Sequence, residues 1–306
     1  MVVRGSPDLS LPVWDGGSTK GLTAQTMRML PPIARRFVAG ETAAEAIDRA
    51  IERNDEGIGA IVNLLGEYYT AREDIQRDTE AYLGLIQDID RSNLDACISI
   101  KPTQLGLHTS EALFTEQLER IVRAGSEANV FVWIDMEGSN TTEPTIQAFE
   151  ELADQFPRQV GVCLQSNLRR TGEDIKRLAS VPGKIRLVKG AYREPAERGY
   201  QKKSSVNERY RADLAALFRH REWGIAVASH DPDMIGYAKD LYEVHGTPME
   251  FQLLMGVRED AQRELARTYP VYQYIPYGPR WFSYFKRRVL ERSENAMFAA
   301  RAILGK

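Results

Sequence analysis

Eight short apolar runs, each followed by a charged amphipathic stretch, constrain the fold of this 306-residue chain more than any other feature. The runs are rich in β-branched residues, and the stretches between them have helical spacing, as in EALFTEQLERIVRAG and EPTIQAFEELADQF. Continuous apolar strands separated by single helices predict a parallel sheet covered by helices. In chain order the runs are GAIVNLLG, DACISIK, VFVWIDM, VGVCLQS, KIRLVKG, IAVASH, MEFQLLM and VYQYIPY.

The number of repeats favours a closed α/β barrel of the (βα)₈, TIM-like type over an open doubly wound sheet, which usually has fewer strands. No linker interrupts residues 57–306, so we expect one catalytic barrel domain there. Residues 1–56 are predicted to form an N-terminal arm with two helical patterns, TAQTMRMLPPIARRFVAG and ETAAEAIDRAIERNDEG, that cover one end of the barrel. The first 22 residues, rich in Gly, Pro and Ser, are expected to be loosely held.

Charge and apolar content exclude several classes of protein. A net charge of −3 argues against a nucleic-acid-binding surface. No stretch approaches the roughly 18 apolar residues of a membrane span, and no secretory signal is recognisable, so we expect a cytoplasmic chain. Cys97 and Cys163 lie in apolar runs and are predicted to be buried thiols, with no disulfide framework.

Polar residues stand at the carboxyl ends of seven of the eight runs. Each alone could be a solvated loop residue, but in a barrel these ends converge on the active-site face. Together they predict one polar cavity. The residues are Glu67, Lys101, Asp135 with Glu137, Gln165, Lys189, His230, and Tyr274 with Tyr277.

An arginine pair, Arg287-Arg288, follows the last run. Successive helical side chains point about 100° apart, so the two would diverge unless this helix crosses the barrel mouth. A solvated basic face, shared with Lys286 and Arg292, is the alternative. Aromatic residues at 281, 282, 284 and 285 nevertheless predict a helix packed on several sides. An arginine fork in such a setting suits a carboxylate or phosphate.

The residues leave two enzyme classes open. Lys101 or Lys189 could form a Schiff base, as in an aldolase. Alternatively, a flavin or similar ring system could fill the cavity, which the small Gly190 and Ala191 and the hydrogen-bonding groups of Gln165, Arg186 and His230 favour. A non-catalytic carboxylate-binding barrel is a third, rarer option. No P-loop, GxGxxG, CxxC or metal-binding histidine spacing is present, so we expect no metal site.

Eight blocks, in order, resemble the monofunctional proline dehydrogenase family. The resemblance runs from Glu67 to the C-terminus and, more weakly, back to about residue 23. The blocks are LLGE (64–67), SIKPTQLG (99–106), WIDMEGS (133–139), LQSNLRR (164–170), IRLVKGAYREP (185–195), ASHD (228–231), EFQLLMG (250–256) and YIPYGPRWFSYFKRRVLER (274–292).

The resemblance implies a distorted (βα)₈ barrel that binds FAD non-covalently. It implies oxidation of L-proline to Δ¹-pyrroline-5-carboxylate, the first step of proline catabolism to glutamate, by hydride transfer from C5 to flavin N5. Electrons would pass to a quinone, which implies transient contact with the inner face of the cytoplasmic membrane.

The resemblance also implies roles for particular residues. Asp135 and Arg186 would be the catalytic polar residues, with Arg186 near flavin N5, and Glu67 would pair with Arg287 as a gate. SSVN at 204–207 replaces a more acidic stretch that is usual in the family, and we expect it to alter contacts of the cofactor loop. The substrate carboxylate would be held by Lys101, Arg287 and Arg288, and its ring enclosed by Tyr274, Tyr284, Leu254, Ala191 and Tyr192. The FAD contacts would come from Met136, Gln165, Arg186, Lys189, Gly190, Ala191, Ser229 and His230.

Overall fold

The computed structural model describes residues 31–290 of the chain. The Gly/Pro/Ser-rich first 22 residues, the helical pattern before Pro31 and the predicted surface cation Arg292 lie outside the described residues.

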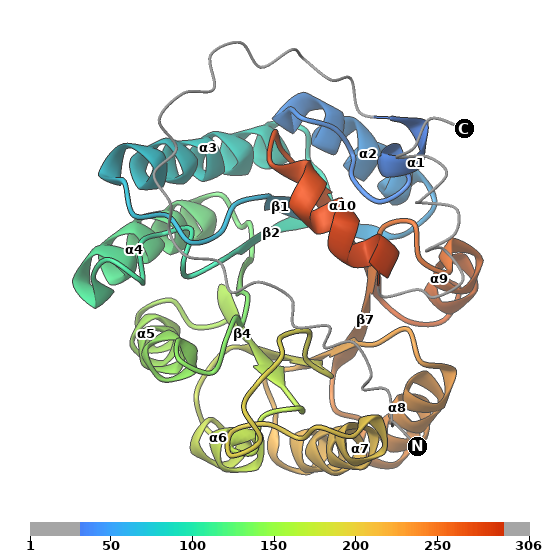
Figure 1. Ribbon diagram of the computed structural model, residues 1–306. Coiled ribbons are helices and arrows are strands. Elements are labelled where there is room, and N and C mark those ends of the chain that lie inside the picture. Colours follow the sequence, from blue (N-terminus) through green and yellow to red (C-terminus); the bar gives the residue numbers. More distant parts are fainter. Residues whose placement is uncertain (1–30, 291–306) are drawn as a thin grey trace, which may run out of the picture.

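Eight parallel strands close into a barrel in simple chain order (Figure 1). The closing pair is β1 with β8, where Ile61 lies opposite Tyr274. The predicted barrel is therefore confirmed, and all eight apolar runs are strands. They are β1 (Gly59–Leu64), β2 (Ala96–Ile100), β3 (Val132–Ile134), β4 (Val160–Gln165), β5 (Lys184–Val188), β6 (Ile225–Ala228), β7 (Met249–Leu254) and β8 (Val271–Tyr277).

Helices surround the strands, and some begin or end where local sequence chemistry predicts. Ser110 and Asp231 cap the N-termini of their helices through side-chain oxygens, and Gly246 ends one helix in the left-handed conformation. The short helix α6 (Thr171–Arg177) was not predicted, because seven mostly polar residues carry too little periodicity. The remaining ring helices are α3 (Arg72–Arg91), α4 (Glu111–Glu127), α5 (Thr142–Gln155), α7 (Lys203–His220), α8 (Pro232–His245) and α9 (Glu259–Ala266).

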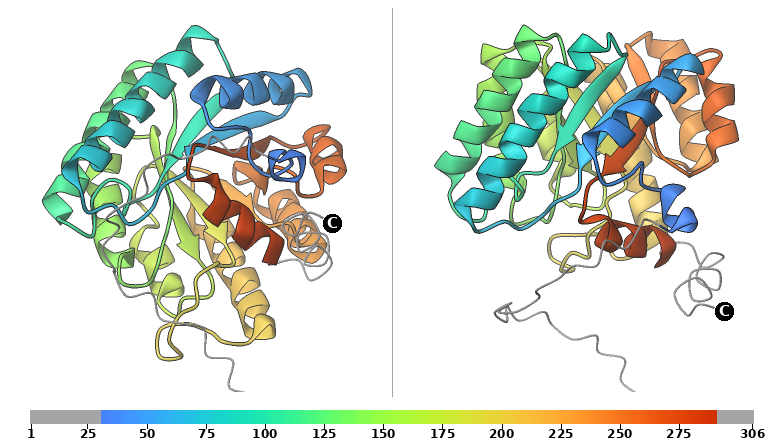
Figure 2. Two further views of the ribbon diagram at one scale, coloured as in Figure 1. Left: turned by 45° about the horizontal axis from the view of Figure 1, so that its top comes forward. Right: turned by 90° about the horizontal axis from the view of Figure 1, so that it is seen from above.

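Two N-terminal helical patterns were expected to cover one end of the barrel. The described part of the first, with α1 (Pro32–Arg35), does lie at the mouth (Figure 2), but the second, α2 (Ala43–Asp55), does not. Helix α2 packs on the outer side of β1 and β8 and completes the helical ring there. A reciprocal capping box between Thr42 and Glu45 fixes its start. The amphipathic spacing of α2 indicated that one face of the helix is buried, but it did not indicate which part of the barrel the face packs on.

The last described helix, α10 (Trp281–Leu290), lies across the mouth of the barrel, beside α1 (Pro32–Arg35) (Figures 1 and 2). This placement is the distortion of the fold, because a regular barrel would keep its eighth helix outside. Phe285 and Tyr284 are buried with Phe37 and Val38, which follow α1. The Phe37 and Phe285 ring centroids are 6.3 Å apart. The first turn of the described chain thus holds the last helix on the mouth.

The barrel interior differs from the apolar layer between strands and helices. Inward-facing residues alternate along the strands, and near the bottom they include Trp133, Ile61 and Cys97. The Trp133 indole fits inside because Gly161 has no Cβ, and one placed there would lie 2.6 Å from the ring. Above this layer the interior becomes polar, which creates room and charge for a site.

Candidate active site

A cavity of about 480 Å³ opens at the carboxyl ends of the strands, beneath α10. Its volume is typical of a site for a small molecule or cofactor. Polar residues of six strand ends converge on the cavity, but Glu137 and Tyr277 of the same predicted set do not line it. Fifteen of the seventeen predicted site residues line it. They are Lys101, Asp135, Met136, Gln165, Arg186, Lys189, Gly190, Ala191, Tyr192, His230, Leu254, Tyr274, Tyr284, Arg287 and Arg288.

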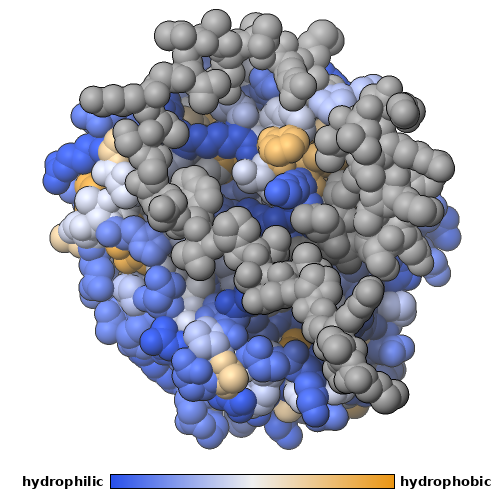
Figure 3. Space-filling model, in the orientation of Figure 1, coloured by the Kyte–Doolittle hydropathy of each residue, from blue (hydrophilic) through white to orange (hydrophobic). Residues whose placement is uncertain are grey.

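Two predicted site residues, Glu67 and Ser229, are not in the cavity wall. Glu67 contacts Arg287 from the rim, and the hydroxyl oxygen of Ser229 accepts a hydrogen bond from the backbone of Asp231. On the face drawn in Figure 3, most of the described surface is hydrophilic.

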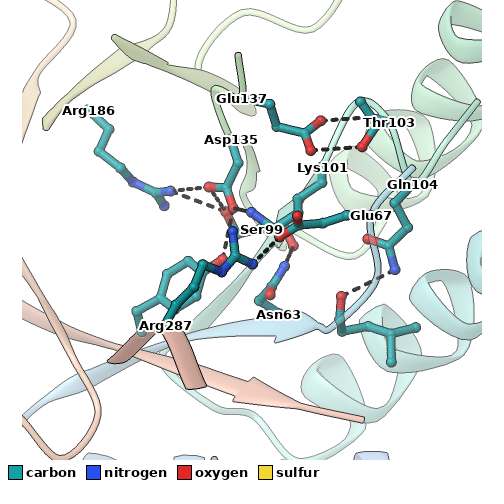
Figure 4. A network of polar contacts seen from close by, with 12 residues as sticks. Asn63, Glu67, Ser99, Lys101, Thr103, Gln104, Asp135, Glu137, Arg186 and Arg287 are labelled. Atoms are coloured by element: carbon teal, nitrogen blue, oxygen red, sulfur yellow. Dashed lines mark hydrogen bonds and ion pairs between the residues drawn. The ribbon is translucent and has the colours of Figure 1, made fainter. Parts of the chain in front are cut away.

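Asp135 is the centre of the polar layer (Figure 4). One carboxylate oxygen accepts hydrogen bonds from Ser99 at 2.7 Å and Arg186 at 2.6 Å. The other accepts from the Tyr274 hydroxyl at 2.8 Å and lies 3.4 Å from the Lys101 ammonium. Asp135 therefore organises the cations of the site.

Burial and charge act in opposite directions on this layer. Burial raises the pKa of Asp135, but Lys101 and Arg186 outweigh it, and the pKa falls below its ordinary value. Burial likewise lowers the pKa of Lys101, yet Asp135 and the surrounding phenols and carboxylates raise it well above 10.5. Asp135 is therefore an anion and Lys101 a cation at neutral pH.

Arg186 lies in the middle of β5 with its side chain inside the barrel, only 4% exposed. Its guanidinium stacks 4.4 Å from the centre of the Trp133 ring and donates to Gln252 as well as Asp135. Its Nη2 has no hydrogen-bond partner among the described residues. A buried cationic donor without a partner among the described residues is suited to a polar ligand atom.

Arg287 and Arg288 both line the cavity. Their side chains diverge, but because α10 lies across the mouth, both still reach the cavity. The solvated-face interpretation therefore holds for Lys286, which is exposed, but not for the pair, although 41% of the Arg287 side chain remains exposed. Arg287 forms an ion pair with Glu67, which lies just after β1 (Figure 4). Burial lowers the pKa of Arg287, but Glu67 more than offsets it, and the pKa is raised.

The long loop after β5 forms the opposite wall. The Lys189 ammonium lies 2.6 Å from Asp231 and 2.7 Å from the Asn207 amide oxygen. Asn207 belongs to the SSVN segment, which therefore contacts the loop after β5. Gly190 has φ +103°, and a Cβ on it would collide with Asn167 at 2.1 Å. Across the cavity, His230 Nε2 accepts from the backbone of Leu254 at 2.9 Å.

Some cavity residues were missed in the sequence. Asn63 and Gln252 are polar residues inside apolar strands, at the same inward-facing phase as Asp135 and Arg186, and that phase could have identified them. The others are apolar or weakly polar and carry no such signal: Cys163, Val188, Ala228 and Leu253. Both cysteines are buried as predicted, and burial raises the pKa of Cys163 to about 12.

Within residues 31–290, no group of three or more potential metal-binding side chains converges. None of the helices in the same range combines the length and hydropathy needed to cross a membrane.

The fold and the site define a (βα)₈ barrel with a cationic cavity at the carboxyl ends of its strands. The family model described as proline dehydrogenase matches residues 46–301. Proline dehydrogenase 1 of Bacillus subtilis strain 168 is 35% identical over 277 residues, which cover 89% of this chain and 91% of the relative. Proline dehydrogenase of Deinococcus radiodurans is 34% identical over 284 residues, covering 89% of this chain and 90% of the relative. The chain belongs to the proline dehydrogenase family, oxidoreductases that act on CH–NH bonds.

Solved structures support the fold. Proline utilization A from Bdellovibrio bacteriovorus, inactivated by N-propargylglycine, superposes with a TM-score of 0.79 at 24% identity. The match covers 85% of this chain but only 32% of that longer polypeptide.

Proposed function

We propose that this chain oxidises L-proline to Δ¹-pyrroline-5-carboxylate with FAD as its bound cofactor. The observation that carries the proposal is the set of three cations, Lys101, Arg287 and Arg288, around one cavity whose base is the Asp135–Arg186 layer. Family membership supplies the reaction class, and the cavity supplies a reason for an amino-acid substrate.

The charge of the cavity favours an anionic ligand. Five cations line the cavity, namely the three above with Arg186 and Lys189, and three carboxylates, Asp135, Glu67 and Asp231, pair with members of this set. The imbalance leaves positive charge next to a largely buried space, where a carboxylate forms strong charge-assisted hydrogen bonds. We assign Arg288 mainly to binding, and Arg287 both to binding and to closing the site through Glu67.

The wall residues also fit a flavin. The unpaired Arg186 Nη2 is a buried donor that needs an acceptor, and family members are generally flavin-dependent. We assign cofactor contacts to Met136, Gln165, Arg186, the backbone and side chains of Lys189–Ala191, His230 and, behind the wall, Ser229. When bound, FAD supplies the acceptor for the hydride that leaves C5 of proline, at flavin N5.

The protein contributes binding and orientation. The three cations fix the carboxylate, while Tyr274, Tyr284, Leu254, Ala191 and Tyr192 enclose the pyrrolidine ring. Positioning of this kind can contribute about 7–11 kcal/mol in favourable cases. Asp135 is not a suitable general base, because both its oxygens already accept hydrogen bonds from donors of the site. The amine proton therefore leaves to solvent, and the neutral amine is the reactive form.

The aldolase alternative loses its physical basis. A Schiff-base lysine must be neutral to attack a carbonyl. Lys101 is instead held as a cation by Asp135, and Lys189 is paired with Asp231. The test is direct: the purified protein should carry a flavin that L-proline reduces. A colourless protein that borohydride traps with a keto-substrate would restore the aldolase.

We further propose that a quinone receives the electrons and that this involves transient contact with the inner face of the cytoplasmic membrane. Only the family resemblance supports these two points. We also propose the division into N-terminal residues 1–56 and a barrel of residues 57–306. Helix α2, in the first part, packs on β1 and β8 of the second.

A further inference from the structure

The loop that carries Glu67 is bound to the end of a neighbouring strand through one threonine. Thr103 follows β2 and is fully buried. Its hydroxyl oxygen accepts a hydrogen bond from the Tyr68 N–H at 3.0 Å, and its carbonyl accepts one from the Tyr69 N–H at 3.1 Å. These two residues directly follow Glu67, so Thr103 fixes the backbone on which the gate carboxylate stands.

Thr103 is itself fixed by Glu137, which follows β3 (Figure 4). One Glu137 carboxylate oxygen accepts from the Thr103 N–H at 2.8 Å, and the other accepts from its hydroxyl at 2.7 Å. The hydroxyl hydrogen therefore points to Glu137, and its lone pairs remain for the Tyr68 N–H. Glu137 is fully buried and is not in the cavity wall, so binding a cavity ligand does not account for its carboxylate.

The backbone at this point is strained. Tyr68 has φ 60°, a left-handed conformation that is unfavourable for a bulky side chain. Such a conformation persists only where its surroundings hold it. Here they are the Thr103 hydrogen bond and the Tyr68 ring stacked on His108, with centroids 5.3 Å apart. Release of the Tyr68 N–H would let the loop relax and turn Glu67 away from Arg287.

We propose that Thr103 and Glu137 are positioning residues that orient Glu67 for its ion pair with Arg287. They thereby determine how tightly the substrate carboxylate is bound. The inference rests on the proposed function, in which Arg287 binds that carboxylate. A chain of contacts thus connects three strand ends with α10. It runs from Glu137 to Thr103 and the Tyr68 backbone, and from there through Glu67 to Arg287.

The test is Thr103→Val, which keeps the shape but removes the hydroxyl. The KM for L-proline should rise about two- to tenfold, the range for one lost buried hydrogen bond, with kcat nearly unchanged. Thr103→Ser should restore the KM. Glu137→Gln, whose amide offers one acceptor instead of two, should resemble Thr103→Val and provides a second variant should the first fail to fold. Thr145→Val is the matched control, because it removes an equally buried hydroxyl from α5 and should leave the KM unchanged.

A double-variant cycle separates this inference from the proposed function. Glu67→Gln alone should raise the KM, and Thr103→Val should add almost nothing to it, since both act through one ion pair. An unchanged KM in Glu67→Gln would refute the gate itself. A raised KM in Glu67→Gln, with no effect of Thr103→Val or with fully additive effects, would overturn the positioning role alone.

Discussion

At the residue scale, the site is a set of cations held apart and oriented by two carboxylates. Asp135 holds Lys101 and Arg186 in the barrel, and Glu67 holds Arg287 at the rim. This division lets each cation present a defined donor to a ligand, because an ion pair fixes one side of its head group and leaves the other open.

Arg288 should matter for binding more than for chemistry. Arg288→Ala should raise the KM for L-proline about tenfold to a hundredfold, since a hydrogen bond to a charged group contributes about 1.5–3 kcal/mol. Steady-state kinetics measure it, with Lys286→Ala as a control that removes an exposed cation from the same helix. Equal KM values in the two variants would contradict the carboxylate assignment.

The site should keep its charges over a wide pH range. The pKa of Asp135 is depressed, so its stabilising contribution is present above its ordinary 3.8 and is lost as pH falls through the folded-state value. The pKa of Lys101 is raised, so its contribution is present below 10.5 and is lost as pH rises through the folded-state value. Between these limits, kcat/KM should rise with pH as the substrate amine deprotonates. A profile that falls from neutral to alkaline pH would oppose this mechanism.

At the scale of elements, α10 matters most for the site, because it brings Arg287 and Arg288 to the cavity. The sequence predicted this placement only on the condition that the helix crosses the barrel mouth. Aromatic residues on several sides of the helix indicated burial on several sides, which placed Arg287 and Arg288 in a cavity once eight strands were counted. The partner that holds α10, the segment after α1, could not be predicted, because contacts between distant segments leave no local pattern. The position of α2 could not be predicted for the same reason, and α6 was missed because its seven mostly polar residues carry too little periodicity.

Packing between α1 and α10 should therefore control substrate binding. Phe37→Ala should cost about 3–5 kcal/mol of stability and also raise the KM for L-proline, because α10 loses its support. Phe114→Ala, at a fully buried position in α4, should lower stability comparably without changing the KM. Thermal unfolding and kinetics on both variants test it, and parallel KM changes would argue against a specific role of this contact.

At the scale of the whole molecule, the number of strands was predictable because apolar runs alternate regularly with helical stretches. The ring of polar strand ends was predictable because those residues stand directly after the runs. The inward-facing Asn63 and Gln252 were not recognised as cavity residues. A single polar residue in an apolar strand indicates a site only when it is known which residues of that strand face the barrel interior. The helical ring is completed by a segment that lies before the first strand, so the proposed boundary near residue 57 divides one packed structure.

A chain limited to residues 57–306 should fail to fold, since it would expose the outer side of β1 and β8 that α2 covers. Soluble yield and circular dichroism measure this. A cooperatively folded, active 57–306 fragment would show that α2 is dispensable.

The most direct test of the central claim is an anaerobic titration of the purified full chain with L-proline, followed by the visible absorbance of its flavin. The account predicts that L-proline bleaches the flavin stoichiometrically, that Δ¹-pyrroline-5-carboxylate appears in equal amount, and that Arg288→Ala shifts the titration to higher L-proline concentrations. A flavin that stays oxidised at saturating L-proline, or a protein that carries none, would contradict it.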